Sequence, residues 1–118
     1  MRKKIERRES RSRVKKKIEE ERKASLLDKQ IQQAVLSLEL GEYNKSVVHF
    51  EKIRKEHPDN SSFMKPYAEA LMYTDNIKQA MPILESLLHQ TPEDIRLNTL
   101  YAQALYRKQF ILRIGSLL

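Results

Sequence analysis

The sequence repeats at an interval of 34 residues, which is the separation between Pro58 and Pro92. In this register apolar, small and proline positions coincide: Tyr43 with Ile77, Ser46 with Ala80, Phe50 with Leu84, Ile53 with Leu87, and Pro58 with Pro92. Further upstream, Ala34, Ala68 and Ala102 share one position of the repeat, and Leu36, Ala70 and Ala104 share another. A period of this length indicates that one supersecondary unit is used several times.

Each repeat has the pattern of two antiparallel helices. Tyr43, Val47, Phe50 and Ile53 follow one another at steps of four, three and three, which places them on one helical face. Small residues in both helices allow the two backbones to approach, and a proline ends the pair. Because each hairpin leaves an apolar face that only its neighbour can cover, we expect the hairpins to stack. An apolar content of 40% with only two glycines fits an all-α protein.

The period and the pattern of small, aromatic and proline positions resemble the tetratricopeptide repeat. The resemblance covers repeats at 27–60 and 61–94 and an incomplete third at 95–118, and it implies a short right-handed solenoid of helical hairpins. The sequence departs from the family pattern at several positions. Gln30, Met64 and Asn98 stand where tryptophan is common, and Gly41 becomes Asp75 in the second repeat.

Two prolines lie where helices are expected. Pro66 should either delay the start of its helix, leaving 61–65 irregular, or kink it, because proline lacks a backbone donor and clashes with the preceding turn. Pro82 presents the same problem in the following helix. We expect a bend near one or both prolines without loss of the fold.

The third repeat is the weakest. Ile114 stands where its second helix should carry a small residue, and no closing proline follows. One explanation is that the repeat array is truncated. The other is an apolar edge that pairs with a second copy or with another protein. The residues of that edge would be Phe110, Ile111, Leu112, Ile114, Leu117 and Leu118.

The resemblance also implies protein recognition by a groove lined with the first helices of successive hairpins. The matching positions are Ile31, Val35, Leu38, Glu69, Met72, Tyr73, Arg96, Gln103, Tyr106 and Arg107. The two arginines could take a carboxylate of a partner peptide or helix. The alternative is that these positions are core or ordinary surface. Only Arg96 suits the carboxylate clamp of chaperone-binding members, because the other matching positions are Ile31, Val35, Pro66 and Leu100, so we predict no such clamp.

The charge is concentrated at the N-terminus. Residues 1–23 contain 12 Lys or Arg and 5 Glu, whereas residues 24–118 contain 11 basic and 11 acidic residues. We therefore predict a basic arm, residues 1–24, that is helical or partly disordered. Its basic residues include Lys3, Lys4, Arg7, Arg8, Lys15, Lys16 and Lys17.

Four interpretations of this arm remain open. It could be a solvated helix, a nonspecific phosphate-binding element, a bipartite nuclear-import signal, or a kinase site at Ser10. Few apolar residues occur in the arm, which argues against a coiled coil or a membrane anchor.

No catalytic constellation is apparent. Cysteine is absent, the spacing of His49, His57 and His89 does not suit a metal, and two glycines cannot build a phosphate loop. We predict a noncatalytic interaction scaffold with no cofactor and no metal. The alternative is a nucleic-acid-associated protein whose arm is the main binding element. Because neither a membrane span nor a secretory signal is evident, we expect a cytoplasmic location, or a nuclear one in a eukaryote.

Overall fold

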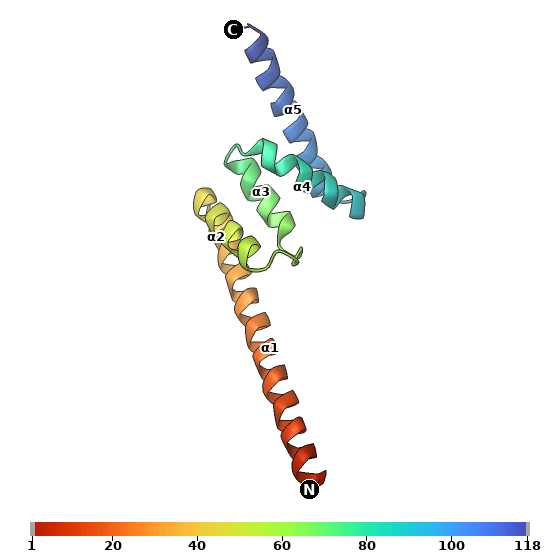
Figure 1. Cartoon of the computed structure of the whole chain (residues 1–118). Coiled ribbons are helices and arrows are strands. Elements are labelled where there is room, and N and C mark those ends of the chain that lie inside the picture. Colours follow the sequence, from red (N-terminus) through yellow and green to blue (C-terminus); the bar gives the residue numbers. More distant parts are fainter. Residues whose placement is uncertain (1, 118) are drawn as a thin grey trace.

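The computed structural model describes residues 2–117, and the side chains of residues 8–115, as α-helices joined by short turns (Figure 1). No strand occurs among the described residues, so the predicted all-α class is confirmed. The helices are α1 (Arg2–Glu39), α2 (Tyr43–Glu56), α3 (Met64–Tyr73), α4 (Ile77–Gln90) and α5 (Ile95–Leu117). Each helix packs on the next, and α3 also contacts α1 and α5. This is the arrangement of stacked hairpins that the 34-residue period predicts.

The turns inside the two hairpins have the same geometry despite their different sequences. Gly41 has a φ of 80° and Asp75, its counterpart one repeat later, has a φ of 60°. In the first turn the Glu42 amide donates to Ser37 O at 2.9 Å and the Gly41 amide to Leu38 O at 3.1 Å. This is a Schellman motif, which satisfies carbonyls at the end of a helix. The second turn repeats both bonds, because aspartate tolerates the left-handed conformation better than most residues do.

Small residues lie where the helices of a hairpin meet. Ala34, Ser46, Ala68 and Ala80 are all fully buried. The Ser46 hydroxyl donates to the Ala34 carbonyl at 2.8 Å, so the backbone of α1 lies directly against α2. A larger side chain at either position would push the two helices apart.

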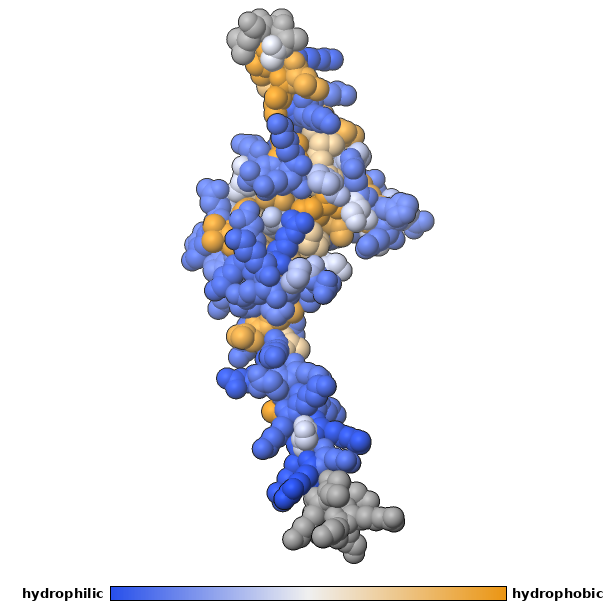
Figure 2. All heavy atoms as spheres, in the orientation of Figure 1, coloured by the Kyte–Doolittle hydropathy of each residue, from blue (hydrophilic) through white to orange (hydrophobic). Residues whose placement is uncertain are grey.

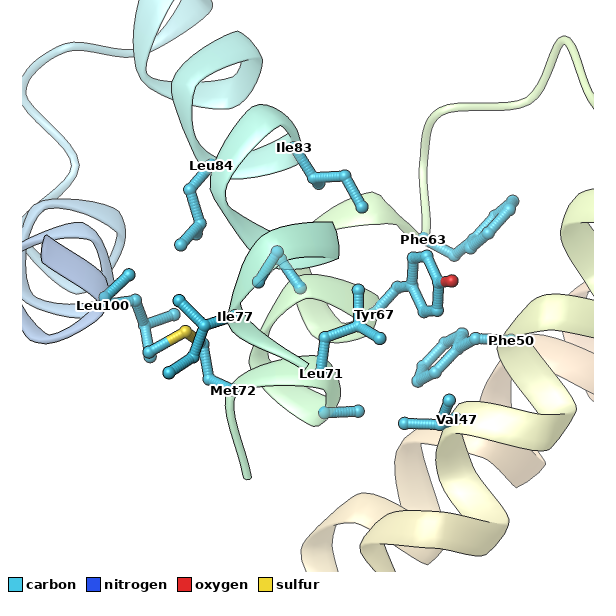
Figure 3. Packing of buried hydrophobic residues seen from close by; sticks show 14 of the residues in the cluster. Val47, Phe50, Phe63, Tyr67, Leu71, Met72, Ile77, Ile83, Leu84 and Leu100 are labelled. Carbon is cyan, nitrogen blue, oxygen red and sulfur yellow. The ribbon is translucent and has the colours of Figure 1, made fainter. Parts of the chain in front are cut away.

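The core is centred on α3, the shortest helix. Phe50 of α2 lies 6.2 Å from Phe63 and 5.9 Å from Tyr67, measured between ring centroids. Figure 3 shows this aromatic cluster on one side of α3, and Met72 with Leu100 on the other side. The α3 helix therefore joins the two hairpins into one hydrophobic core.

The prolines are accommodated in different ways. The α3 helix begins at Met64, so Pro66 lies in its first turn, where the missing amide has no intrahelical partner to lose. The irregular segment is therefore shorter than the predicted 61–65. Pro82 lies inside α4, which is assigned as one helix from Ile77 to Gln90. Its ring is exposed, so the carbonyl that loses its donor can be solvated.

The predicted arm and the first repeat form a single helix. The expected boundary between residues 24 and 27 lies inside α1, which runs over 38 residues without interruption. Residues 8–26 are exposed along this projecting part. The molecule is accordingly long, with dimensions of 82 × 28 × 25 Å, and its ends lie far apart (Figure 1).

The third unit differs from the other two. The position equivalent to Gly41 and Asp75 is Gln109, which lies within α5. Residues 95–117 form one helix, so the expectation of a second helix carrying Ile114 is wrong. Glutamine favours the helix and disfavours the left-handed turn conformation, which explains why α5 continues. Its second half projects beyond the body (Figure 1).

Substitution at one repeat position tests this packing. We expect Ala68→Leu to lower the free energy of unfolding by about 1–3 kcal/mol, because the position is fully buried and a larger side chain would not fit. Ala102→Leu, at the equivalent exposed position of α5, should change it by less than about 0.5 kcal/mol. Urea denaturation followed by circular dichroism measures both values. Equal effects of the two substitutions would contradict the proposed packing.

Candidate protein-interaction surfaces

The predicted groove residues have different environments. Val35, Leu38 and Ile31 are partly buried and pack against the core. Met72 is only 2% exposed, so the prediction that it faces the groove is wrong. Its side chain fills the space between α3 and α5 instead (Figure 3). Glu69 and Arg107 are half-buried, whereas Tyr73, Arg96, Gln103 and Tyr106 are exposed.

A polar network among the predicted groove residues joins α3 to α5. The Arg96 guanidinium forms an ion pair with Glu69 and donates to the Tyr73 hydroxyl at 3.1 Å. The Tyr73 ring stacks on Tyr43 at 4.5 Å between centroids. The hydrogen bond to Glu69 contributes most to raising the pKa of Arg96 above its ordinary value. Tyr43, Tyr73 and Arg96 thus connect the first hairpin to α5.

Arg107, the second arginine of the predicted groove, interacts with the end of α3. Arg107 Nη1 donates to the Met72 carbonyl at 2.8 Å and lies 3.7 Å from a carboxylate oxygen of Asp75. A cation at a helix C-terminus interacts favourably with the terminal carbonyls. Both arginines are therefore engaged by groups of the chain itself. A carboxylate of a partner would have to compete with these groups for either arginine.

Asp94 caps the N-terminus of α5 and forms a third connection to α3. Its Oδ1 accepts the Leu97 amide at 3.0 Å, and its Oδ2 accepts Lys65 Nζ at 2.6 Å. These bonds, led by the one from Lys65, lower the pKa of Asp94 below its ordinary value. The start of α5 is thereby fixed on the body.

The second half of α5 presents a continuous apolar surface. Tyr106, Phe110, Ile111, Leu112 and Ile114 are all exposed there. Figure 2 shows the resulting hydrophobic colouring on the projecting part of α5, in contrast to the hydrophilic projecting part of α1. The predicted edge residues Leu117 and Leu118 lie outside the side chains that the structure describes. We refer to Tyr106, Phe110, Ile111, Leu112 and Ile114 as the α5 edge.

A notch between α4 and α5 extends this edge. It has a volume of about 420 Å³ and is lined by Ile77, Lys78, Met81, Pro82, Glu85, Lys108, Ile111 and Leu112. The sequence interpretation missed the contribution of α4. A signal was present, because Met81 and Pro82 are apolar residues beyond the fully buried positions of α4; Met81 is partly buried and Pro82 is exposed. The notch makes the α5 edge concave on one side.

The basic arm lies on the opposite end of the molecule. Arg8, Lys15, Lys16 and Lys17 are exposed on α1. Lys3, Lys4 and Arg7 lie outside the side chains that the structure describes. The arm therefore offers cationic groups on a helix that projects into solvent (Figure 1).

Among the side chains of residues 8–115, no group of three or more His, Cys, Asp or Glu residues is arranged to hold a metal ion. No described helix combines the length and apolar character needed to cross a membrane. The candidate functional sites are therefore the surface features of α1, α3, α4 and α5 described above.

Comparison with known proteins identifies the family. The sequence profile of the tetratricopeptide repeat matches residues 37–104, which is more than half of the chain. The chain belongs to the tetratricopeptide repeat family, whose domains generally mediate protein–protein interactions and are typically noncatalytic scaffolds. No curated protein and no solved structure gives a significant match. The matched range ends at Ala104 and so does not include the α5 edge.

The cap of α5 gives a pH-dependent prediction. Because its pKa is lowered on folding, Asp94 stabilises the protein above the pKa of an unfolded-chain aspartate, about 3.9. This contribution is lost as the pH falls through the lowered pKa. We expect Asp94→Asn to reduce the Tm at neutral pH, and the difference from the wild type to vanish in acid.

Thermal denaturation over a series of pH values measures this difference. Asp59→Asn provides the control, because it removes the same charge from an exposed turn residue. A Tm difference for Asp94→Asn that is independent of pH would contradict the role of the Asp94 carboxylate.

Proposed function

We propose that this protein is a noncatalytic interaction module that binds a partner peptide or helix through the α5 edge and the adjoining notch. The observation that carries the proposal is the concentration of exposed apolar side chains on the second half of α5. Contiguous apolar patches of this kind on a folded domain are typical of interaction sites. Family membership supports the same class of function.

The composition of the edge fits a binding surface. Tyr106 and Phe110 supply aromatic groups, and aromatic residues are enriched among those that dominate binding energy. The notch adds a concave apolar surface beside Ile111 and Leu112. Lys78, Glu85 and Lys108 lie among its lining residues and can form polar contacts around the apolar centre.

The groove is the weaker part of the proposal. Its arginines already interact with Glu69 and with the Met72 carbonyl, and Met72 itself is buried. Tyr73, Gln103 and Tyr106 remain exposed there. A peptide in the groove would reach the α5 edge at Tyr106, which both surfaces share.

Paired variants distinguish the edge from the groove. We expect Phe110→Ser combined with Ile111→Ser and Leu112→Ser to reduce partner capture about tenfold or more, because the edge loses its apolar contacts. Tyr73→Ala combined with Gln103→Ala should leave capture nearly unchanged. The measurement is quantitative mass spectrometry of proteins retained by each immobilised variant. Loss of capture only with the groove pair would contradict binding at the edge.

A nucleic-acid-associated role is the second candidate, and the exposed basic helix favours it. Residues 1–23 have a net charge of +7, and residues 8–26 project from the body without being covered. Lysines and arginines on such a helix bind phosphates by releasing counterions, without base specificity. In this role the repeats would present the arm to the nucleic acid.

Salt dependence tests the arm. For a DNA duplex, neutralising Lys15, Lys16 and Lys17 by substitution with Gln should reduce the slope of log K against log salt concentration by about 2 to 3. The matched control replaces Lys45, Lys52 and Lys55, which are exposed on α2, with Gln. Fluorescence anisotropy titrations at several salt concentrations give the slopes. Equal changes for the two triple variants, or no binding by the wild type, would exclude the arm as the binding element.

A further inference from the structure

Comparison of α3 with α5 at equivalent repeat positions reveals an uncovered packing surface. On α3, Ala68 and Leu71 are fully buried, and Met72 is nearly so. The equivalent residues on α5 are Ala102, which is exposed, Leu105, which is 38% exposed, and Tyr106, which is 71% exposed. Within residues 2–117, α3 is contacted by α1, α2, α4 and α5, whereas α5 is contacted only by α3 and α4, which leaves these positions of α5 uncovered. We call Ala102, Leu105 and Tyr106, together with Leu112, which is 65% exposed further along the same helix, the α5 seam.

We propose that an acidic amphipathic helix of a partner protein packs antiparallel to α5 on this seam, as α4 packs on α3. The inference rests on the proposed function and specifies which kind of partner binds at the α5 end of the molecule.

The first support for this inference is geometric. In the first hairpin Ser46 of the second helix lies against Ala34 of the first. In the second hairpin Ala80 and Ala68 occupy the same repeat positions and are fully buried. Ala102 preserves that small position on α5 and leaves room for a close approach.

The dimensions of the seam fit one helix. From Ala102 to Leu112 the seam extends for about 15 Å along α5, at roughly 1.5 Å per residue. The α2 and α4 helices have 14 residues each, which corresponds to about 21 Å. A helix of that size would cover the seam and reach the notch beside Leu112. Figure 1 shows the projecting half of α5 with no helix alongside it.

Charge favours an acidic partner over a second copy. Residues 104–115 contain Arg107, Lys108 and Arg113 and no Asp or Glu. Two α5 helices packed antiparallel would bring these like charges together, which disfavours self-association. A helix with Glu or Asp beside its apolar face would instead meet charges of opposite sign. Lys108 lines the same notch as Leu112, so an acidic flank of the partner helix would meet a positive charge next to the seam.

The experiment uses two peptides based on the α4 sequence, Asn76 to Thr91. In the acidic peptide, Lys78, Pro82 and Ser86 are replaced by Glu; in the basic peptide, Pro82 and Ser86 are replaced by Lys. These three residues are exposed on α4, so the apolar face is unchanged in both peptides. Fluorescence anisotropy with the full chain measures the binding of each peptide.

We expect the acidic peptide to bind at least about tenfold more tightly than the basic one, because only it complements the charge of α5. The Ala102→Gln variant should weaken binding of the acidic peptide by about tenfold, since a longer side chain prevents close approach without changing the charge. Ala24→Gln is the matched control at an exposed alanine of α1 and should have no effect.

Several results would overturn the inference. Equal binding of both peptides would remove the acidic requirement, and an unchanged affinity in Ala102→Gln would place the site elsewhere. Sedimentation equilibrium that showed a dimer abolished by Ala102→Gln would assign the seam to a second copy. If neither peptide binds while the triple α5-edge variant still loses partner capture, the inference fails and the proposed function stands. If the edge variant also captures normally, both fail.

Discussion

The close approach of paired helices at small residues is the constraint on which this structure depends. Ser46 can donate to the Ala34 carbonyl only because neither residue carries a side chain that separates α1 from α2. Ala68 and Ala80 are buried in the same way in the second hairpin. Once the hairpins are closed, their remaining apolar faces meet around α3, which becomes the centre of the core. The arrangement of the packed helices therefore follows from two small positions repeated at a fixed interval.

Closure of the second hairpin on α5 relies on polar as well as apolar contacts. Lys65 with Asp94, Glu69 with Arg96, and the Met72 carbonyl with Arg107 form a row of connections between α3 and α5. These contacts engage Glu69, Arg96 and Arg107, three of the predicted groove residues, with groups of the chain itself. Farther along α5, beyond Arg107, exposed apolar side chains replace such contacts. Polar contacts with α3 along its first half and exposed apolar side chains along its second half thus divide α5 into two parts.

Much of the fold could be predicted from the sequence because the period records which residues face one another. The hairpins, their small contacts and the turn at Gly41 follow from it. The burial of Met72 and the pairing of Arg96 could not be predicted, because both depend on how α5 crosses α3, which no local pattern specifies. The continuation of α5 through Gln109 was accessible in principle. A glutamine at the position of Gly41 and Asp75 is itself a signal against a turn.

The unbroken α1 helix gives the molecule a consequence beyond packing. Its 38 residues span about 57 Å, at roughly 1.5 Å per residue, and carry the basic charge away from the hairpins. The α5 edge projects at the other end of a molecule 82 Å long (Figure 1). Ligands held at the two ends would be separated by most of this length. The chain therefore keeps its basic end and its exposed apolar end apart by most of its length.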